Sequence, residues 1–334
     1  MILTRTPLRV SLFGGGPDYP AWFERHEGAV LGMAIDKYVY VGVKRMPPGQ
    51  SMKYRVQYSK VQDCMLVSEI KHPAVRGALE FLKVDHPLEF HIFADQPGRS
   101  GLGGSSAFVV GLLHALHRQL VPSRESLDAW QLVDAAIMLE RDVIKEAVGC
   151  QDQIFAAHGG LKFLTFSDIG RTVRTLDLPG HIVRELEQRL VLVHTGTMRD
   201  AHEMAAKQIA LIEDGFNTAV LTRLAEIAHE GLELLLEGTD RERLRLGQLL
   251  HEGWELKKRL HPEISSKAID QLYLRGLDLG ATGGKLLGAG GGGFMLFFVP
   301  STDDMLKLRR GIGTESVDFR IAWQGTHVLV NEPT

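Results

Sequence analysis

Short apolar runs in the N-terminal half of the chain are separated by polar stretches, a pattern typical of β-strands. Segments 1–13 and 29–45 are rich in apolar and β-branched residues. The same pattern predicts further strands over 54–58, 88–93, 161–166 and 189–194. Apolar residues at helical spacing instead predict helices over 107–120 and 123–144, the second with Ser123 or Ser126 as its N-cap.

The C-terminal half has a different, more helical pattern. Amphipathic, leucine-rich segments are punctuated by Gly215, Gly238 and Pro262 and predict helices over 200–212, 217–237, 240–260 and 265–279. A continuous apolar strand over 294–299 follows, and another helix and one or two strands close the chain. The change predicts two α+β domains, 1–185 and 186–334, with the boundary in the region 175–195.

Composition narrows the class of protein. The 334 residues are 44% hydrophobic and 24% charged, as in ordinary globular proteins, and the net charge is −3, so no global basic field attracts nucleic acid or anionic lipid. Two cysteines, Cys64 and Cys150, exclude a disulfide framework. The sequence shows neither a signal-peptide core nor an apolar run of membrane-spanning length. We therefore expect a cytoplasmic protein without nucleic-acid or membrane partners; a homodimer is left open.

Glycine clusters at 14–16, 98–104 and 283–293 are the most unusual feature of the sequence. The middle cluster lies between a predicted strand and a predicted helix, where backbone N–H groups and the positive helix end can bind an anion such as phosphate. The pattern is neither GxxxxGK[ST] nor GxGxxG. The alternative is a glycine turn capped by serine. The candidate nucleotide-binding residues of this loop are Pro97, Gly98, Ser100, Gly101, Leu102, Gly103, Gly104, Ser105 and Ser106.

Phosphoryl transfer also needs groups that neutralise charge and accept a proton, and two carboxylates are candidates. Glu140 ends a predicted helix, although an exposed, ion-paired helical charge is the simpler interpretation. Asp152 lies between Gln151 and Gln153 and precedes the apolar segment 154–157, which places it at a buried edge. Because a carboxylate there needs partners to stay charged, a functional role is favoured over a turn or capping role.

Three segments, in order, resemble the motifs of the GHMP kinases. They are TPLRVSLFGGGPDY at 6–19, GLGGSSA at 101–107 and GKLLGAGGGGF at 284–294. The resemblance implies an ATP-dependent kinase, a phosphotransferase with an alcohol group as acceptor, that uses ATP and Mg²⁺. It also implies a two-domain α+β fold, with an N-terminal domain like ribosomal protein S5 domain 2 and a ferredoxin-like C-terminal domain. Gly290 and Gly291 of the third motif are then expected beside the nucleotide.

The same resemblance assigns roles to single residues. Glu140 would bind Mg²⁺ together with Ser106, or with Ser105, because Gly104 stands where the family has its first serine. Asp152 would be the catalytic base. Arg9 would favour ionisation of the attacking hydroxyl, and it would act by its charge because arginine stays protonated. Lys145 departs from the family pattern, since it occupies a position where glycine is expected.

The first motif is similar to that of one branch of the family, which contains D-glycero-D-manno-heptose 7-phosphate kinases and the kinase part of fucose kinases. The shared pattern is GGGPD at 14–18, although Pro17 replaces the usual threonine. This implies phosphorylation of the anomeric hydroxyl of heptose 7-phosphate to the 1,7-bisphosphate. Candidate substrate residues are Gly15, Gly16, Asp18, Gln151, Arg199 and Lys285. The alternatives are a kinase of fucose, galactose or a mevalonate-type alcohol, a non-catalytic sensor, and a nucleotide hydrolase.

Overall fold

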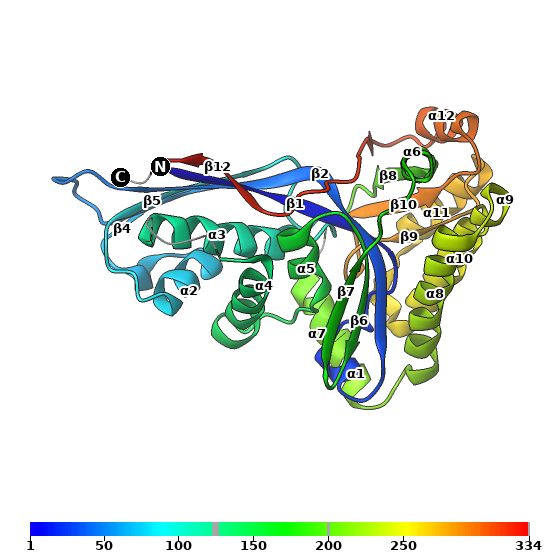
Figure 1. Cartoon of the computed structure of the whole chain (residues 1–334), viewed down its shortest axis with the longest axis horizontal. Coiled ribbons are helices and arrows are strands. Elements are labelled where there is room, and N and C mark those ends of the chain that lie inside the picture. Colours follow the sequence, from blue (N-terminus) through cyan, green and yellow to red (C-terminus); the bar gives the residue numbers. More distant parts are fainter. Residues whose placement is uncertain (122–126, 199–200, 333–334) are drawn as a thin grey trace.

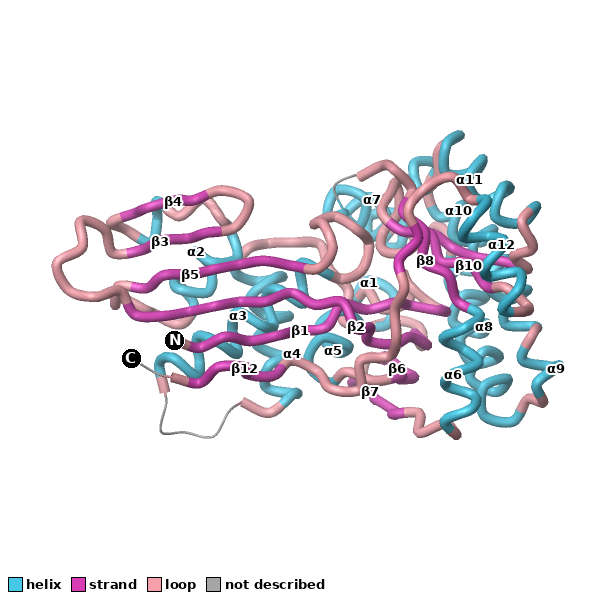
Figure 2. Tube along the Cα trace, turned by 90° about the horizontal axis from the view of Figure 1, so that it is seen from above, coloured by secondary structure: helices cyan, strands magenta, loops and turns pink. Residues whose placement is uncertain are grey.

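The computed structural model describes residues 1–121, 127–198 and 201–332. Its larger sheet follows the order β12-β1-β2-β5-β3-β4, and β6 and β7 continue from β2 (Figures 1 and 2). The pairs are antiparallel except β3 with β5. The strands of this sheet are β1 (Ile2–Phe13), β2 (Gly28–Arg45), β3 (Tyr54–Gln57), β4 (Val61–Cys64), β5 (Leu88–Ala94), β6 (Leu161–Ser167), β7 (Gly170–Thr175) and β12 (His327–Asn331).

Strand β2 is the spine of this sheet, because its 18-residue, largely apolar run pairs with three other strands. It pairs with β1 along most of its length, with β5 over Val39–Arg45 and with β6 over Gly28–Met33. At Gly32 an added Cβ would lie 2.8 Å from the Val10 carbonyl oxygen and 2.9 Å from the Phe155 ring. The missing side chain thus lets α5, and with it Asp152, approach the sheet closely.

Helices cover one face of the larger sheet (Figure 1). Helix α3 lies in the middle and packs on β1 and β2, which explains why it is apolar and buried over nearly all of its length. Helix α4 leads directly into a five-residue π-helical turn, Leu139–Val143. The helices of this half are α1 (Pro20–Phe23), α2 (Pro73–Phe81), α3 (Gly104–Leu120), α4 (Ala129–Met138) and α5 (Gln151–His158).

A second sheet has the order β11-β8-β10-β9 and is fully antiparallel. Helix α10 packs on β9, and α8 packs on β2 of the larger sheet, so the two halves share a core. The strands are β8 (Leu190–His194), β9 (Gly283–Leu286), β10 (Phe294–Phe298) and β11 (Ser316–Val317). The helices are α6 (Gly180–Arg189), α7 (Ala201–Glu213), α8 (Thr218–Glu237), α9 (Asp240–Arg243), α10 (Arg245–Leu260), α11 (Lys267–Asp278) and α12 (Thr302–Gly311).

The end of the chain returns to its beginning. Strand β12 pairs with β1 in the larger sheet, and the Glu332 amide donates to the Met1 carbonyl oxygen at 3.0 Å. The division into 1–185 and 186–334 stays a prediction. The structure adds that the last strand of the second segment belongs to the sheet of the first. In the described part of the chain, no helix is both long and apolar enough to cross a membrane.

Two sequence predictions of helix boundaries are wrong. Helix α4 begins at Ala129, and its cap is Asp128, whose side chain accepts a hydrogen bond from the Gln131 amide. The predicted caps Ser123 and Ser126 lie outside the described residues. The helix predicted over 240–260 is interrupted at Leu244, where α9 ends and α10 begins.

Candidate active site

A cavity of about 610 Å³ lies where the two halves meet, and most of the predicted site residues line it. Its wall includes the end of β1, the first two glycine clusters, the start of α5, α7 and the turn after β9. The predicted residues in the wall are Arg9, Gly15, Gly16, Asp18, Gly98, Ser100, Gly101, Gly103, Gly104, Ser105, Ser106, Gln151, Asp152 and Lys285. Segments nearly 300 residues apart in sequence therefore form one site.

The loop before α3 has the backbone of an anion site. Gly101 and Gly103 have φ values of 77° and 73°, which favour glycine, and α3 begins at Gly104. The loop is tied to β1 because the Arg9 amide donates to the Leu102 carbonyl oxygen at 3.0 Å. The first helical turn, at residues 104–106, lines the cavity, and a helix start of this kind offers unpaired N–H groups and a positive dipole end. This arrangement suits the phosphates of a nucleotide.

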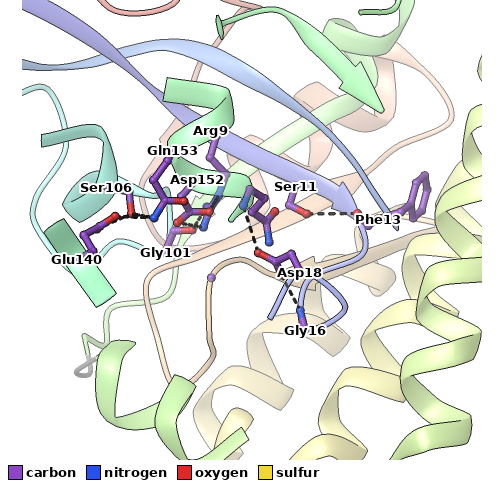
Figure 3. Close-up of polar contacts among 12 residues, drawn as sticks. Arg9, Ser11, Phe13, Gly16, Asp18, Gly101, Ser106, Glu140, Asp152 and Gln153 are labelled. Carbon is purple, nitrogen blue, oxygen red and sulfur yellow. Dashed lines mark hydrogen bonds and ion pairs between the residues drawn. The ribbon is translucent and has the colours of Figure 1, made fainter. Parts of the chain in front are cut away.

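Arg9 and Asp152 form a two-pronged ion pair beside this loop (Figure 3). The Arg9 Nε and Nη2 atoms donate to the two carboxylate oxygens at 2.7 and 2.9 Å. The third nitrogen, Nη1, donates to the Gly101 carbonyl oxygen at 2.5 Å. Gly103 leaves room for the pair, since an added Cβ would lie 3.1 Å from Arg9 and 3.2 Å from Asp152. The guanidinium thus fixes the carboxylate at the edge of the anion loop.

Glu140 lies behind the loop in the π-helical turn and is fully buried. Ser106 Oγ donates to Glu140 Oε1 at 2.8 Å, and the Gln153 amide nitrogen donates to Oε2 at 2.5 Å. Burial raises the pKa of Glu140 to about 8, which these two hydrogen bonds only partly offset. The predicted metal pair is therefore Ser106 with Glu140, whereas Ser105 is exposed on the cavity side.

Glu140→Gln tests this burial in metal-free protein. The folded-state pKa of about 8 exceeds the reference value of 4.5, so Glu140 holds its proton in the folded state and stabilises the fold at low pH. That contribution is lost as pH rises, at up to about 1.36 kcal/mol per pH unit. The free energy of unfolding of wild type minus that of the variant should fall by about 2–5 kcal/mol between about pH 5 and pH 8.

Urea unfolding of both proteins in EDTA across this range measures the difference. Taking the difference between the two proteins cancels the pH dependence that other buried groups contribute to both. One such group is His114, because burial lowers its pKa to about 4. If the free energies of unfolding of the two proteins changed equally with pH, the assignment of a neutral, buried Glu140 would be contradicted.

Asp18 is a second buried carboxylate in the cavity wall, on the far side of Asp152 from Glu140 (Figure 3). It accepts from the amides of Gly16 at 3.2 Å and Gln151 at 3.4 Å. Burial, and then the negative charge of Asp152, raise the pKa of Asp18. An added Cβ at Gly149 would lie 2.0 Å from Asp18 Oδ2, so only glycine fits there. A carboxyl group that is buried but lines the cavity is suited to binding hydroxyl groups.

The third glycine cluster contributes a different glycine to the cavity wall than expected. Gly290 and Gly291 pack on Ile264 and do not line the cavity. Their role beside the nucleotide stays a prediction. Gly288 lies in the wall instead, and an added Cβ there would be 2.7 Å from the Gly101 Cα. Pro97 and Leu102 also lie outside the wall, and Leu102 is buried beneath the loop. Arg199 lies outside the described residues.

Several cavity residues were not predicted from the sequence, and two groups of them matter most. His72 and Phe108 line the wall beside the start of α3, with ring centroids 4.9 Å apart. Lys257 of α10 also lines the wall, although it was treated only as part of an amphipathic helix. A signal was present, because Lys257 falls three residues after buried Trp254 and three before buried Leu260. Lysine on the buried stripe of a helix is unusual and points to a function.

Lys145 follows the π-helical turn in the left-handed conformation, with φ of 58°. The glycine that the family pattern predicts here would avoid this strain. Lys145→Gly is expected to raise the free energy of unfolding by about 0.5–1 kcal/mol, because relief of left-handed strain exceeds the added chain entropy. Urea unfolding measures the change. Lys145→Ala is the control, since it keeps the Cβ, and an equal gain in that variant would contradict the strain argument.

Comparison with known proteins identifies the family. The family model for the GHMP kinases N terminal domain matches residues 71–160, and the one for the GHMP kinases C terminal domain matches 232–316. The chain therefore belongs to the GHMP kinases and is an ATP-dependent small-molecule kinase, a phosphotransferase with an alcohol group as acceptor. The predicted two-domain α+β fold and enzyme class are confirmed.

Two curated relatives carry names from the expected branch. The chain is 30% identical over 340 residues to the D-glycero-alpha-D-manno-heptose 7-phosphate kinase of Campylobacter jejuni, covering 97% of each. It is 29% identical to the bifunctional fucokinase/GDP-fucose pyrophosphorylase of Arabidopsis thaliana, covering 94% of this chain and 31% of that longer protein. The crystal structure of a D-glycero-D-manno-heptose 1-phosphate kinase from Bacteroides thetaiotaomicron shares the fold, with a TM-score of 0.76, 24% identity and 99% of each chain covered.

Proposed function

We propose that this kinase transfers the γ-phosphoryl group of ATP to a sugar phosphate, and that the acceptor is the anomeric hydroxyl of D-glycero-D-manno-heptose 7-phosphate. The observation that carries the proposal is the Arg9–Asp152 pair. It lies between the anion loop and the Asp18 carboxyl in one cavity. A phosphate donor on the loop and a hydroxyl acceptor near Asp18 would therefore meet at Asp152.

The nucleotide would bind at the α3 end of this cavity. Its phosphates would accept hydrogen bonds from the backbone of 101–106. The base would extend toward His72 and Phe108, whose rings offer an apolar surface in the wall.

The residues present also fit a magnesium ion. Ser106 and Glu140 offer the hard oxygen donors that Mg²⁺ prefers, and the hydrogen bonds of the Glu140 carboxyl come from a neutral hydroxyl and a neutral amide, so no cation of the described residues is bonded to it. The described residues contain no cluster of three or more metal-binding side chains. Magnesium sites in proteins commonly use one or two protein carboxylates together with substrate phosphates. A magnesium ion held by Ser106 and Glu140 would supply positive charge to offset the negative charge of the nucleotide phosphates.

Asp152 would accept the proton of the attacking hydroxyl. The hydroxyl oxygen forms a bond to the γ-phosphorus, the bond from that phosphorus to the β–γ bridging oxygen breaks, and ADP leaves with that oxygen. Arg9 holds both carboxylate oxygens in place and adds positive charge where negative charge develops. Asp18 would orient the sugar through its other hydroxyl groups.

Support for the heptose substrate comes from the 30% identical relative, a D-glycero-alpha-D-manno-heptose 7-phosphate kinase that matches along nearly the whole chain. An acceptor panel tests it: the purified kinase is mixed with ATP, Mg²⁺ and each sugar, ADP is measured, and the product is identified by phosphorus NMR. We expect ADP release with heptose 7-phosphate and a new anomeric phosphate. Turnover of only free fucose, galactose or mevalonate would overturn the acceptor. ADP release without any acceptor would indicate a hydrolase, and no turnover at all a sensor.

A further inference from the structure

Two lysines of the C-terminal half lie buried in the wall of the cavity. Lys257 on α10 is 6% exposed and Lys285 on β9 is 5% exposed. The Lys257 ammonium donates to the carbonyl oxygens of Leu286 at 2.9 Å and Gly288 at 2.5 Å. The Lys285 ammonium donates to the Gly14 carbonyl oxygen at 3.1 Å. Both cations therefore sit on neutral backbone groups.

No carboxylate contacts either ammonium group within the residues that the structure describes. The one carboxyl that acts on both at longer range is Asp18, and the Arg9 guanidinium opposes it. Asp152 is already engaged by Arg9. Burial lowers the pKa of Lys285 to about 7 and that of Lys257 well below its usual value, and neighbouring positive charges add to both shifts. A buried cation without a paired anion is costly, which makes this pair an incomplete site.

The position of the pair suggests what completes it. Lys285 contacts the loop that carries Asp18, and Lys257 contacts Gly288, which packs against Gly101 of the anion loop. The two ammonium groups thus lie between the proposed acceptor side and the phosphate side. We propose that Lys257 and Lys285 form a two-lysine site for a phosphate group that the reaction brings into the cavity. This inference rests on the proposed function.

Such a group has two sources, which are the phosphate of the acceptor and the transferred phosphoryl group of ATP. Lys257→Met and Lys285→Met keep the length of the side chain and remove its charge. Isothermal titration measures the affinities of heptose 7-phosphate, inorganic phosphate, the ATP analogue AMPPNP and ADP. Losing one charged hydrogen bond weakens binding by about 10- to 100-fold.

If the acceptor's phosphate occupies the site, both variants lose this affinity for heptose 7-phosphate and inorganic phosphate but keep that for AMPPNP. If the transferred phosphoryl group occupies it, both lose affinity for AMPPNP relative to ADP and keep that for heptose 7-phosphate. If variant and wild type have equal affinities, or if the variants lose affinity equally for all four ligands, the proposal is wrong. The lysines would then serve only to hydrogen-bond backbone carbonyl oxygens.

Lys258→Met is the matched control. Lys258 is the next residue of α10, does not line the cavity and pairs with Glu255, so its variant should bind all four ligands like wild type. If a methionine variant does not fold, Lys257→Gln or Lys285→Gln replaces it in the same titrations, because glutamine removes the charge but can still donate to the backbone carbonyl oxygens. Failure of the wild type to phosphorylate heptose 7-phosphate would reject the proposed acceptor, while the phosphate, AMPPNP and ADP measurements would still test the lysines.

Discussion

Asp152→Asn is expected to lower kcat by about 100- to 10,000-fold, the range that a positioned general base contributes. The amide keeps the shape of the side chain and one of its hydrogen bonds to Arg9, but it cannot take the proton of the attacking hydroxyl. It also removes the negative charge that balances the guanidinium. Because Asp152 lies at the first turn of α5 and not in the core, we expect the fold and nucleotide binding to persist.

Coupled ADP-release kinetics with the acceptor identified by the panel measure this change, and AMPPNP titration reports nucleotide binding. Asp142→Asn is the control, because Asp142 is an exposed carboxylate in the neighbouring π-helical turn and should leave kcat unchanged. A kcat for Asp152→Asn within about threefold of wild type would show that Asp152 does not accept the proton. The positive charge of Arg9 would then be the main contribution to transition-state stabilisation.

Much of the fold was predictable because local patterns agree with tertiary burial. Strands β1 and β2 are rich in apolar and β-branched residues, β10 is a continuous apolar run, and all three become inner strands of their sheets, while α3 is an apolar helix under the larger sheet. The elements that were missed are short or polar. Helix α2 is amphipathic but has only nine residues and begins with Pro73, and β7 is largely exposed, so neither forms an apolar run long enough to stand out in the sequence.

The site was predictable only in part, for a similar reason. Glycine clusters and the acid Asp152 are marked by local composition, so sequence alone selected them. The family resemblance already placed Ser106 ahead of Ser105 as the partner of Glu140, but the π-helical turn that brings Glu140 to Ser106 could not be predicted from the sequence. Lys257 is far in sequence from every motif, and it enters the cavity only because α10 packs on β9. Contacts of this kind depend on tertiary packing.

Gly101→Ala is expected to damage both the fold and ATP binding, because the anion loop and the turn after β9 touch backbone to backbone. An added Cβ at Gly101 would lie 2.6 Å from the Leu287 carbonyl oxygen, and the φ of 77° is unfavourable for alanine. The strain and the required shift should lower the free energy of unfolding by about 2–4 kcal/mol. The displaced loop should raise the KM for ATP by more than about tenfold, since its amides bind the phosphates.

Gly215→Ala separates the cost of the left-handed backbone from the cost of the contact with the turn after β9. Gly215 has nearly the same φ, 75°, but nothing lies within 4 Å of an added Cβ, and it does not line the cavity. Its variant should lose only the backbone term of about 1–2 kcal/mol and keep the wild-type KM for ATP. Urea unfolding and ATP titration of the kinase reaction measure both quantities. If the two variants lose equal stability and both keep the KM, then the contact between Gly101 and the turn at Leu287–Gly288 does not position the nucleotide loop.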